Sequence, residues 1–439
     1  QVKDASGLTL TALRLKRVAP QIALAAACIV LLLGLYAGYR WLQPRPDTVL
    51  AVIATPDTAP CENGQSEAIA KLVQDKLKHF RGVQIIRHEN SARNQPFLLI
   101  DADLTQAALT AEANTVLKVT ATNCTDGKNS IQYLLSSKQG TPIAKGTASD
   151  LGQMLLAIVN TLHLQGSSVA LQTSDWEAQY YRALALLDHY DNTDSVNEAL
   201  TLLHRIEETD APNIARVKAA LGWGYYLKYY LTKARENKDK AISYTDQATS
   251  TPGDNPDVLL LCGKVSVALG NLEKAIANFK QVLQQRADDP DAVLSLARAY
   301  EFKGDLQQAE EQYLRALVLR PNYWDVYNQL GAFYFDRGEF RKAEEYWRKV
   351  TDLLDTNPCG FNNLGSALLY QEQYQAAERA YRDAIKRRPL TDTYHSLGTA
   401  YLFQGLCDQA LDVFTKGQAI DPQDPEFWGA EGDALSCSG

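Results

Sequence analysis

Four of the seven cysteines lie where disulfide chemistry would need them. Cys61 and Cys124 each follow a predicted strand by a few residues, and two neighbouring strands would bring them to the same edge of a sheet. In an oxidising compartment such thiols form a disulfide, with two free thiols in loops as the alternative. Cys407 in a predicted turn and Cys437 near the C-terminus form a second and weaker pair. Cys359 is then left over.

The other residues that could perform chemistry form no catalytic or metal-binding pattern. The six histidines are scattered at no spacing that a metal site uses, so we assign no metal. The sequence has no GxxxxGK[ST] loop, no GxGxxG after a strand, no HExxH, no CxxC and no GxSxG. We therefore expect neither catalysis nor a cofactor in this chain.

Composition limits the classes of partner. The 439 residues are 46% apolar and 22% charged, which is ordinary for a folded protein. The formal net charge is −8, whereas a protein that grips nucleic acid needs a basic face to neutralise phosphates. We therefore expect no nucleic-acid binding by this chain.

The elements that would position a binding site form a repeat. Six alanines recur at spacings of 34, 34, 34, 34 and 33 residues, and each of the last five has a small residue twelve positions earlier and an aromatic four positions later. The alanines are Ala241, Ala275, Ala309, Ala343, Ala377 and Ala410; the small residues are Gly263, Ala297, Gly331, Gly365 and Gly398; the aromatics are Phe279, Tyr313, Trp347, Tyr381 and Phe414. Helices that cross closely need Gly or Ala at the crossing, and an aromatic fills the remaining space. The pattern resembles the tetratricopeptide repeat, in which pairs of short antiparallel helices stack.

The repeats are expected to form an α-solenoid of about seven helical hairpins over residues 172–439. Near its C-terminal end Trp428, Gly432 and Leu435 match the first helix of a further repeat, but the sequence ends before a second helix. A capping helix with a polar outer face is one explanation. We favour a truncated repeat, because the chain also begins without an initiator Met.

Binding residues are expected on the first helices of the repeats, which form the concave face of such an array. They lie three positions before the small residue, one position after it, or about a turn further along. The candidates are Asn328, Asn362, His395, Arg298, Phe335, Tyr370 and Phe403. Amides can hydrogen-bond the backbone of an extended peptide while aromatics hold its side chains. Ordinary solvated residues would give the same pattern, so both interpretations are open.

The N-terminal segment predicts a transmembrane helix over residues 18–42. Residues 22–39 are almost wholly apolar, long enough to cross the hydrocarbon core of a bilayer with flanking help. A cleavable signal peptide is the alternative, but its apolar region would be shorter and would end in a small-x-small site. Positive charges precede the span, so residues 1–17 are expected in the cytoplasm and the bulk of the chain in the periplasm. Gly34 and Gly38 have the GxxxG spacing that would permit a homodimer.

From residue 46 to 165 the pattern changes to alternating strands and helices, which indicates a small α/β domain. The predicted strands span 48–54, 82–87, 116–122, 130–136 and 143–147, and the predicted helices span 66–80, 104–113 and 150–164. The first two strands and the intervening helix form a βαβ unit. The whole chain is therefore expected to be mainly α, with one transmembrane helix, this domain and the solenoid.

This order of parts resembles the extracytoplasmic half of bacterial membrane-anchored receptors, whose small α/β domain is of the kind found at the N-terminus of TolB. The repeats look like those of kinase-linked members in the stretches 320–324, 327–331, 361–365 and 394–398. The resemblance implies a cytoplasmic serine/threonine kinase domain or, as in CadC-like regulators, a winged-helix DNA-binding domain. No residues of either lie in these 439 positions, so such a domain would precede Gln1.

We therefore expect an extracytoplasmic scaffold or sensory module of the bacterial inner membrane, which binds a protein or peptide through the groove of its repeats. Two other functions are open. One is the sensor half of a receptor kinase or of a membrane-tethered transcription regulator. The other is an accessory subunit of a secretion, pilus or respiratory complex. The sequence does not choose between them.

Overall fold

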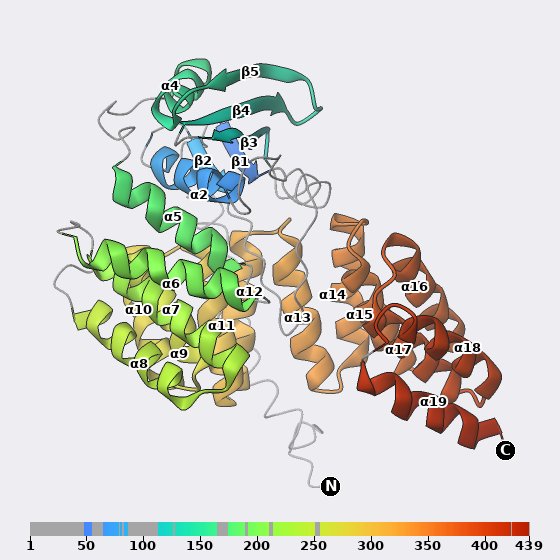
Figure 1. Cartoon of the computed structure of the whole chain (residues 1–439). Helices are drawn as coiled ribbons and strands as arrows, with labels where there is room; N and C mark the ends of the chain where they lie inside the picture. Colours follow the sequence, from blue (N-terminus) through green and yellow to red (C-terminus); the bar gives the residue numbers. More distant parts are fainter. Residues whose placement is uncertain are drawn as a thin grey trace, which may run out of the picture. The chain divides into compact units, whose positions relative to one another are not determined.

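The computed structural model describes residues 48–54, 65–78, 80, 83–86, 113–125, 128–164, 174–188, 192–209, 214–250, 255–422 and 424–438 (Figure 1). The predicted transmembrane helix over 18–42, the predicted cytoplasmic segment 1–17, nearly all of the predicted helix over 104–113, and Cys61 lie outside these residues. Within the described ranges, none of the helices combines the length and the apolar character that crossing a bilayer requires.

The N-terminal part of the described chain is a mixed sheet with strand order β2-β1-β3-β4-β5. The strands are β1 Thr48–Ala54, β2 Val83–Ile86, β3 Thr115–Thr125, β4 Lys128–Ser137 and β5 Pro142–Ala148. β1 pairs in parallel with both β2 and β3, whereas β3, β4 and β5 are antiparallel. The predicted strands and the βαβ unit are confirmed. β3 is longer than predicted, however, so Cys124 lies within the strand and not in the loop after it.

Two helices cover this sheet, and one of them is buried on two faces. α4, Leu151–Thr161, buries Met154 and Ile158 in the core of the sheet. α2, Gln65–Leu77, contributes Val73 and Leu77 to the same core. Its other face places Leu72 in a second core that the first helices of the C-terminal array form. Because α2 belongs to both cores, it joins the sheet to the array.

Charged side chains add to this contact of α2. Lys76 Nζ lies 2.8 Å from Glu177 Oε1, and both side chains are largely shielded from water. Lys78, which directly follows α2, has its Nζ 2.6 Å from Asp75 of that helix and 2.8 Å from Asp257 in the first turn of a helix far along the chain. Shielded pairs of this kind form only in a particular geometry, so they accompany the apolar contact of α2 with the array.

The rest of the described chain is an array of antiparallel helical pairs followed by one further helix (Figure 1). The pairs are α5 Asp175–Asp188 with α6 Thr193–Glu207, α7 Ile214–Thr232 with α8 Arg235–Ser250, α9 Pro256–Ala268 with α10 Leu272–Gln285, α11 Pro290–Lys303 with α12 Leu306–Leu319, α13 Trp324–Asp336 with α14 Phe340–Leu353, α15 Pro358–Leu369 with α16 Tyr374–Arg387, and α17 Thr391–Leu402 with α18 Cys407–Gln418; the last helix is α19 Pro425–Ser438. In each pair we call the earlier member the first helix and the later one the second helix.

Local signals set where the first helices begin. Pro290 and Pro358 occupy the first turns of α11 and α15, where the missing N–H is not needed. Before them, the side chains of Asp289 and Asn357 accept hydrogen bonds from backbone N–H groups of the first turn. The same combination begins α9, whereas α13 and α17 begin without a side-chain cap, so these local signals act in three of the repeats only.

The helix crossings confirm the predicted role of the small residues. A Cβ atom built on Gly331 would come within 2.5 Å of the Trp347 ring, and one built on Gly365 within 2.6 Å of the Tyr381 ring. The aromatics of the second helices are buried, and the alanines four positions before them are fully enclosed. The first helices α9, α13, α15 and α17 therefore each carry a socket that the aromatic of the second helix fills, whereas Gly222 on α7 faces Thr245 instead.

Candidate partner-binding site

The seven predicted binding residues all lie on first helices or at their C-terminal ends. α11 carries Arg298, α13 carries Asn328 and Phe335, α15 carries Asn362, and α17 carries His395; Tyr370 and Phe403 are the C-cap residues that follow α15 and α17. They come from four successive repeats, at offsets of three before, one after, four after or five after the small residue, which lie on one side of a helix. We call the surface that these residues share the first-helix face.

Exposed aromatic side chains are the most unusual feature of the first-helix face. Tyr370 is 56% exposed and Phe403 is 62% exposed, and each lies five positions after the small residue of its repeat. Phe302, which sequence reasoning missed, has the same offset from Ala297 and is 53% exposed. Large aromatics left in water along a repeat are typical of an interaction surface. The shared offset of five was the signal that would have found Phe302.

Two of the predicted aromatics come together in a cluster. The rings of Phe335 and Tyr370 lie 5.2 Å apart, edge to face, so α13 and the end of α15 meet here. Phe340, at the start of α14, stacks on Tyr370 at 5.0 Å and contacts Phe335 at 5.3 Å. Phe335 is half-buried behind Tyr370. The outer ring is therefore held in place by the two inner ones.

The predicted polar residues differ in whether their side chains have hydrogen-bond partners. Asn328 Oδ1 accepts a hydrogen bond from Asn363 Nδ2 at 3.1 Å, which links α13 to α15. Asn362 Oδ1 is buried and has no hydrogen-bond partner among the described residues, and the same holds for Nε of Arg298. The Arg298 guanidinium lies 6.0 Å from the centre of the Phe302 ring. Asn328 thus joins two helices, whereas Asn362 and Arg298 keep unsatisfied polar atoms.

His395 is packed among rings. Its imidazole centre lies 5.8 Å from that of Phe414 on α18 and 6.1 Å from that of Phe427 on α19. Phe414 is the aromatic that fills the socket at Gly398, and Phe427 is fully buried. The side chain of His395 therefore contributes to the packing of the last three helices.

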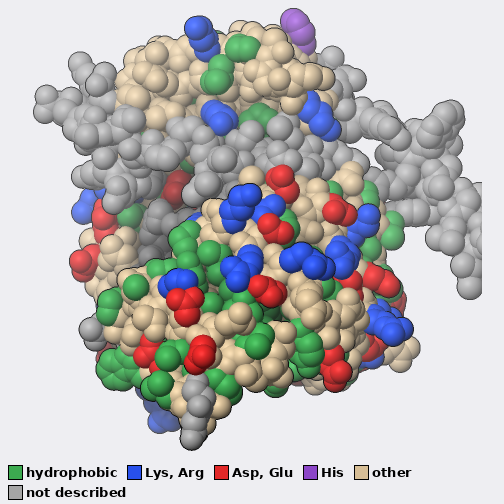
Figure 2. Space-filling model, turned by 90° about the vertical axis from the view of Figure 1, so that its right-hand side faces the viewer, with side chains coloured by type: hydrophobic (Ala, Val, Ile, Leu, Met, Phe, Trp, Pro, Cys, Tyr) green, Lys and Arg blue, Asp and Glu red, His purple; other side chains and the backbone are tan. Residues whose placement is uncertain are grey.

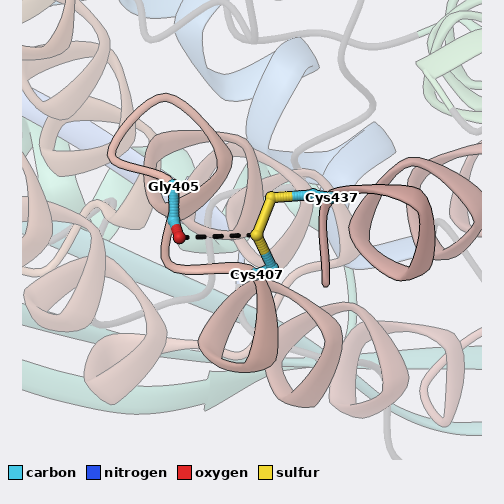
Figure 3. Close-up of a disulfide and its surroundings, with 3 residues drawn as sticks. All are labelled: Gly405, Cys407 and Cys437. Carbon is cyan, nitrogen blue, oxygen red and sulfur yellow. Dashed lines mark hydrogen bonds between the residues drawn. A yellow bond between two sulfur atoms is a disulfide. The ribbon is translucent and has the colours of Figure 1, made fainter. Parts of the chain in front are cut away.

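The cysteine pairs have different outcomes. Cys407, at the start of α18, and Cys437, in α19, form a disulfide with a Cα–Cα distance of 5.6 Å, which confirms the second predicted pair (Figure 3). Cys407 Sγ also lies 3.4 Å from the carbonyl oxygen of Gly405. Cys359 is a thiol, as predicted. The pairing of Cys61 with Cys124 stays a prediction, because Cys61 is outside the described residues.

The described side chains offer no chemistry of another kind. Among them, no three His, Cys, Asp or Glu residues converge as a metal ion would need. The thiol of Cys262 is buried in α9, and burial raises its pKa to about 12. A thiol with such a pKa is almost wholly protonated at neutral pH and is a poor nucleophile. Recognition therefore explains the exposed residues of the array better than catalysis does.

Comparison with known proteins identifies the repeats. Residues 266–317, 325–353 and 362–425 match models of the tetratricopeptide repeat. No protein with a curated function matches the sequence.

Several solved structures are similar to part of this chain. A MamA protein is 24% identical over 38% of this chain and 92% of its own, with a TM-score of 0.34. YrrB, described as a TPR protein with an unusual peptide-binding site, is 16% identical over 43% of this chain and 97% of its own, with a TM-score of 0.35. A tetratricopeptide-repeat protein from Parabacteroides merdae ATCC 43184 is 14% identical over 58% of this chain and 99% of its own, with a TM-score of 0.43.

Proposed function

We propose that this tetratricopeptide-repeat protein is an interaction scaffold that binds an extended segment of a partner protein along its first-helix face. The observation that carries the proposal is the row of exposed aromatics, Phe302, Tyr370 and Phe403, at one position of three repeats. Aromatic side chains placed in this way supply a large share of the binding energy at protein interfaces. The three aromatics lie at the C-terminal ends of α11, α15 and α17, with Asp336 at the same position of α13 between them, and this spread suits an extended ligand better than a small molecule.

Polar atoms on the same face would orient that ligand. The side chains of Asn362 and Arg298 are only half-buried. An amide can donate to and accept from a peptide backbone, and a guanidinium can donate to a peptide carbonyl. An extended backbone offers both kinds of group in alternation.

The location we propose is the outer side of a bacterial inner membrane, with the chain anchored by its apolar segment over 18–42. Support comes from that segment and from the Cys407–Cys437 disulfide, since disulfides persist in oxidising compartments and are rare in the cytosol. Two other functions are open: a receptor whose output domain precedes Gln1, and a subunit of a membrane complex. The intact mass of the native membrane protein, measured with its partners crosslinked, distinguishes them. A mass larger than this chain by a whole domain would support the receptor, and a mass equal to this chain with partners in a fixed ratio would support the subunit.

Site-specific photocrosslinking tests the binding proposal. A photoreactive phenylalanine analogue at Tyr370 or Phe403 should crosslink to one defined segment of a partner in the native membrane. The control position is Val318, which is equally exposed but lies on the second helix α12. A peptide of the captured segment should then bind the purified protein, and Phe403→Ser should weaken this binding by about tenfold or more without altering thermal unfolding. Equal crosslinking at Val318, or an unchanged affinity of Phe403→Ser, would contradict the proposal.

A further inference from the structure

Several rings of the array have a cation over one face. Lys342 Nζ lies 4.5 Å from the centre of the Tyr334 ring. On the first-helix face itself, the guanidinium carbon of Arg298 lies 6.0 Å from the centre of the Phe302 ring. The face of an aromatic ring carries partial negative charge and attracts a cation at such distances. The chain therefore provides one of the three exposed aromatics of this face with a cation of its own.

The other two exposed aromatics, Tyr370 and Phe403, have no such cation from within the chain. Arg298 directly follows the small residue of its repeat. In the repeat of Tyr370 that position holds Ser366, and in the repeat of Phe403 it holds Thr399. Among the described residues, no Lys or Arg side chain lies over either ring. A cation on these rings would have to come from a bound partner.

Neighbouring rings hold Tyr370 in one orientation. Phe340 stacks on it with ring centres 5.0 Å apart and planes inclined by 25°. The Phe335 ring meets it edge to face, at 5.2 Å and 85°. More than half of Tyr370 is nevertheless exposed. A side chain that is already fixed loses little conformational entropy on binding, so this ring is suited to recognise a flat group of a partner.

The charge of the first helices favours a cation on their face. α13, α15 and α17 contain Asp325, Asp336 and Asp392 and no Lys or Arg. The second helices α14 and α16 carry four Lys or Arg residues each, and Figure 2, which faces the side of α16 and α18, shows basic side chains among acidic ones. Asp336 is exposed and directly follows Phe335, whose ring contacts Tyr370. The repeat before Tyr370 therefore contributes a carboxylate at the same level of the face.

We propose that the segment bound on the first-helix face carries an arginine, whose guanidinium stacks on the Tyr370 ring and pairs with the Asp336 carboxylate. This inference rests on the proposed function and adds the chemistry of the partner. A guanidinium is planar, so it can lie on a ring while its N–H groups point outward to a carboxylate. The ammonium of lysine has no plane to stack and is more strongly hydrated, so arginine is preferred over lysine.

A library of random short peptides displayed on phage probes this face without presupposing a sequence. The selection is carried out on the purified full-length chain. Peptides that bind this chain but do not bind Phe403→Ser are taken as ligands of the first-helix face. We expect arginine to be enriched among these peptides, and more strongly than lysine.

Affinities of one such peptide, measured by fluorescence anisotropy, locate its arginine. Replacing the arginine with citrulline keeps its shape but removes its charge, and should weaken binding by about tenfold. Tyr370→Leu and Asp336→Lys should each weaken binding of the arginine peptide and reduce the effect of citrulline.

The control variant is Asp352→Lys, which changes the net charge by the same amount as Asp336→Lys. Asp352 is also exposed but lies on the second helix α14, so this variant should leave both affinities unchanged. All three substituted residues are exposed, so thermal unfolding should change little in any of the variants.

Two results would overturn this inference while the proposed function stands. One is a set of Phe403-dependent peptides in which arginine is not enriched, or in which lysine is enriched as strongly. The other is an effect of citrulline that is as large in Tyr370→Leu and Asp336→Lys as in the unmodified protein, which would place the arginine elsewhere on the array. Recovery of no peptide that depends on Phe403 would contradict the proposed function, and this inference with it.

Discussion

The turns between the first and second helices of the last five pairs share one backbone geometry, and in one of these five turns the residue that adopts it is not glycine. Gly304, Gly338 and Gly405 have φ values of 85°, 73° and 68° in these turns. Glu372 lies 34 residues after Gly338 and has a φ of 59°. The left-handed conformation costs a residue with a Cβ roughly 1–2 kcal/mol. The turn between α15 and α16 is therefore a strained version of its neighbours.

Replacing Glu372 with Gly should stabilise the array. The Glu372 side chain is exposed, so the change removes backbone strain without removing buried contacts. Part of the gain is offset by the greater freedom of Gly in the unfolded chain, which leaves a net stabilisation of about 0.5–1 kcal/mol. Urea unfolding measures it. The reverse substitution, Gly338→Ala, should destabilise by a similar amount, although its Cβ would meet no atom within 4 Å. A loss of stability in Glu372→Gly would contradict this account.

Single positions were predictable from the sequence where the repeat constrains them. The pairing of Gly365 with Tyr381 follows from the constant offset between small and aromatic residues, and the structure confirms it. The hydrogen bond from Asn363 to Asn328 and the packing of His395 on Phe414 were not predictable, because they depend on the positions of neighbouring helices. Phe302 was predictable, because it lies five positions after Ala297 as Tyr370 and Phe403 lie after their glycines, but the offset of five was not applied to this repeat.

At the scale of elements, periodicity gave the helices of the array and the strands of the sheet within a few residues. The sequence did not reveal that α2 is buried on two faces. Apolar side chains of a helix that pack on a sheet are of the same types as those that pack on other helices, so composition does not distinguish them. Leu72 and Val73 are neighbours in sequence but belong to different cores. β3 was underestimated because Asn123 and Cys124 are poor indicators of a strand, whereas pairing with β4 extends it to Thr125.

Removing the disulfide should loosen the C-terminal end of the array. Cys407 and Cys437 are separated by 30 residues, and closing a loop of this length is worth about 3–4 kcal/mol in the chain-entropy model. In the double variant Cys407→Ser with Cys437→Ser, the amides of α19 should therefore exchange faster than they do in the wild-type protein. The exchange of α13 should be unchanged. Cys359→Ser is the control, because Cys359 is not part of the disulfide. If α19 exchanged equally slowly in the double variant, packing of Phe427 alone would hold the helix.

At the scale of the whole described chain, an ionic cluster joins the sheet and the array through α2. Arg216 on α7 donates a hydrogen bond from Nη2 to the Tyr181 hydroxyl at 2.6 Å and lies 3.5 Å from Asp75 Oδ1. Its guanidinium also lies 5.2 Å from the centre of the Tyr180 ring. Burial alone would raise the pKa of Asp75, but the charges of Arg216 and Lys78 outweigh it and hold that pKa below its usual value. The cluster thus holds α2 on the array while its carboxylate is ionised.

This cluster makes the contact of α2 with the array sensitive to acid. A carboxylate whose pKa is lowered by folding contributes stability above its unfolded pKa, near 4, and loses it as the pH falls through the folded value. Hydrogen exchange of α2 should therefore accelerate below about pH 4, and less so in Asp75→Asn. At neutral pH, Arg216→Met should destabilise by about 3 kcal/mol because it leaves Asp75 shielded without this partner. Arg348→Met, which removes an exposed pair with Glu344, should cost at most about 0.5 kcal/mol. Equal effects of the two arginine variants would mean that apolar packing at Leu72, and not charge, sets the position of α2.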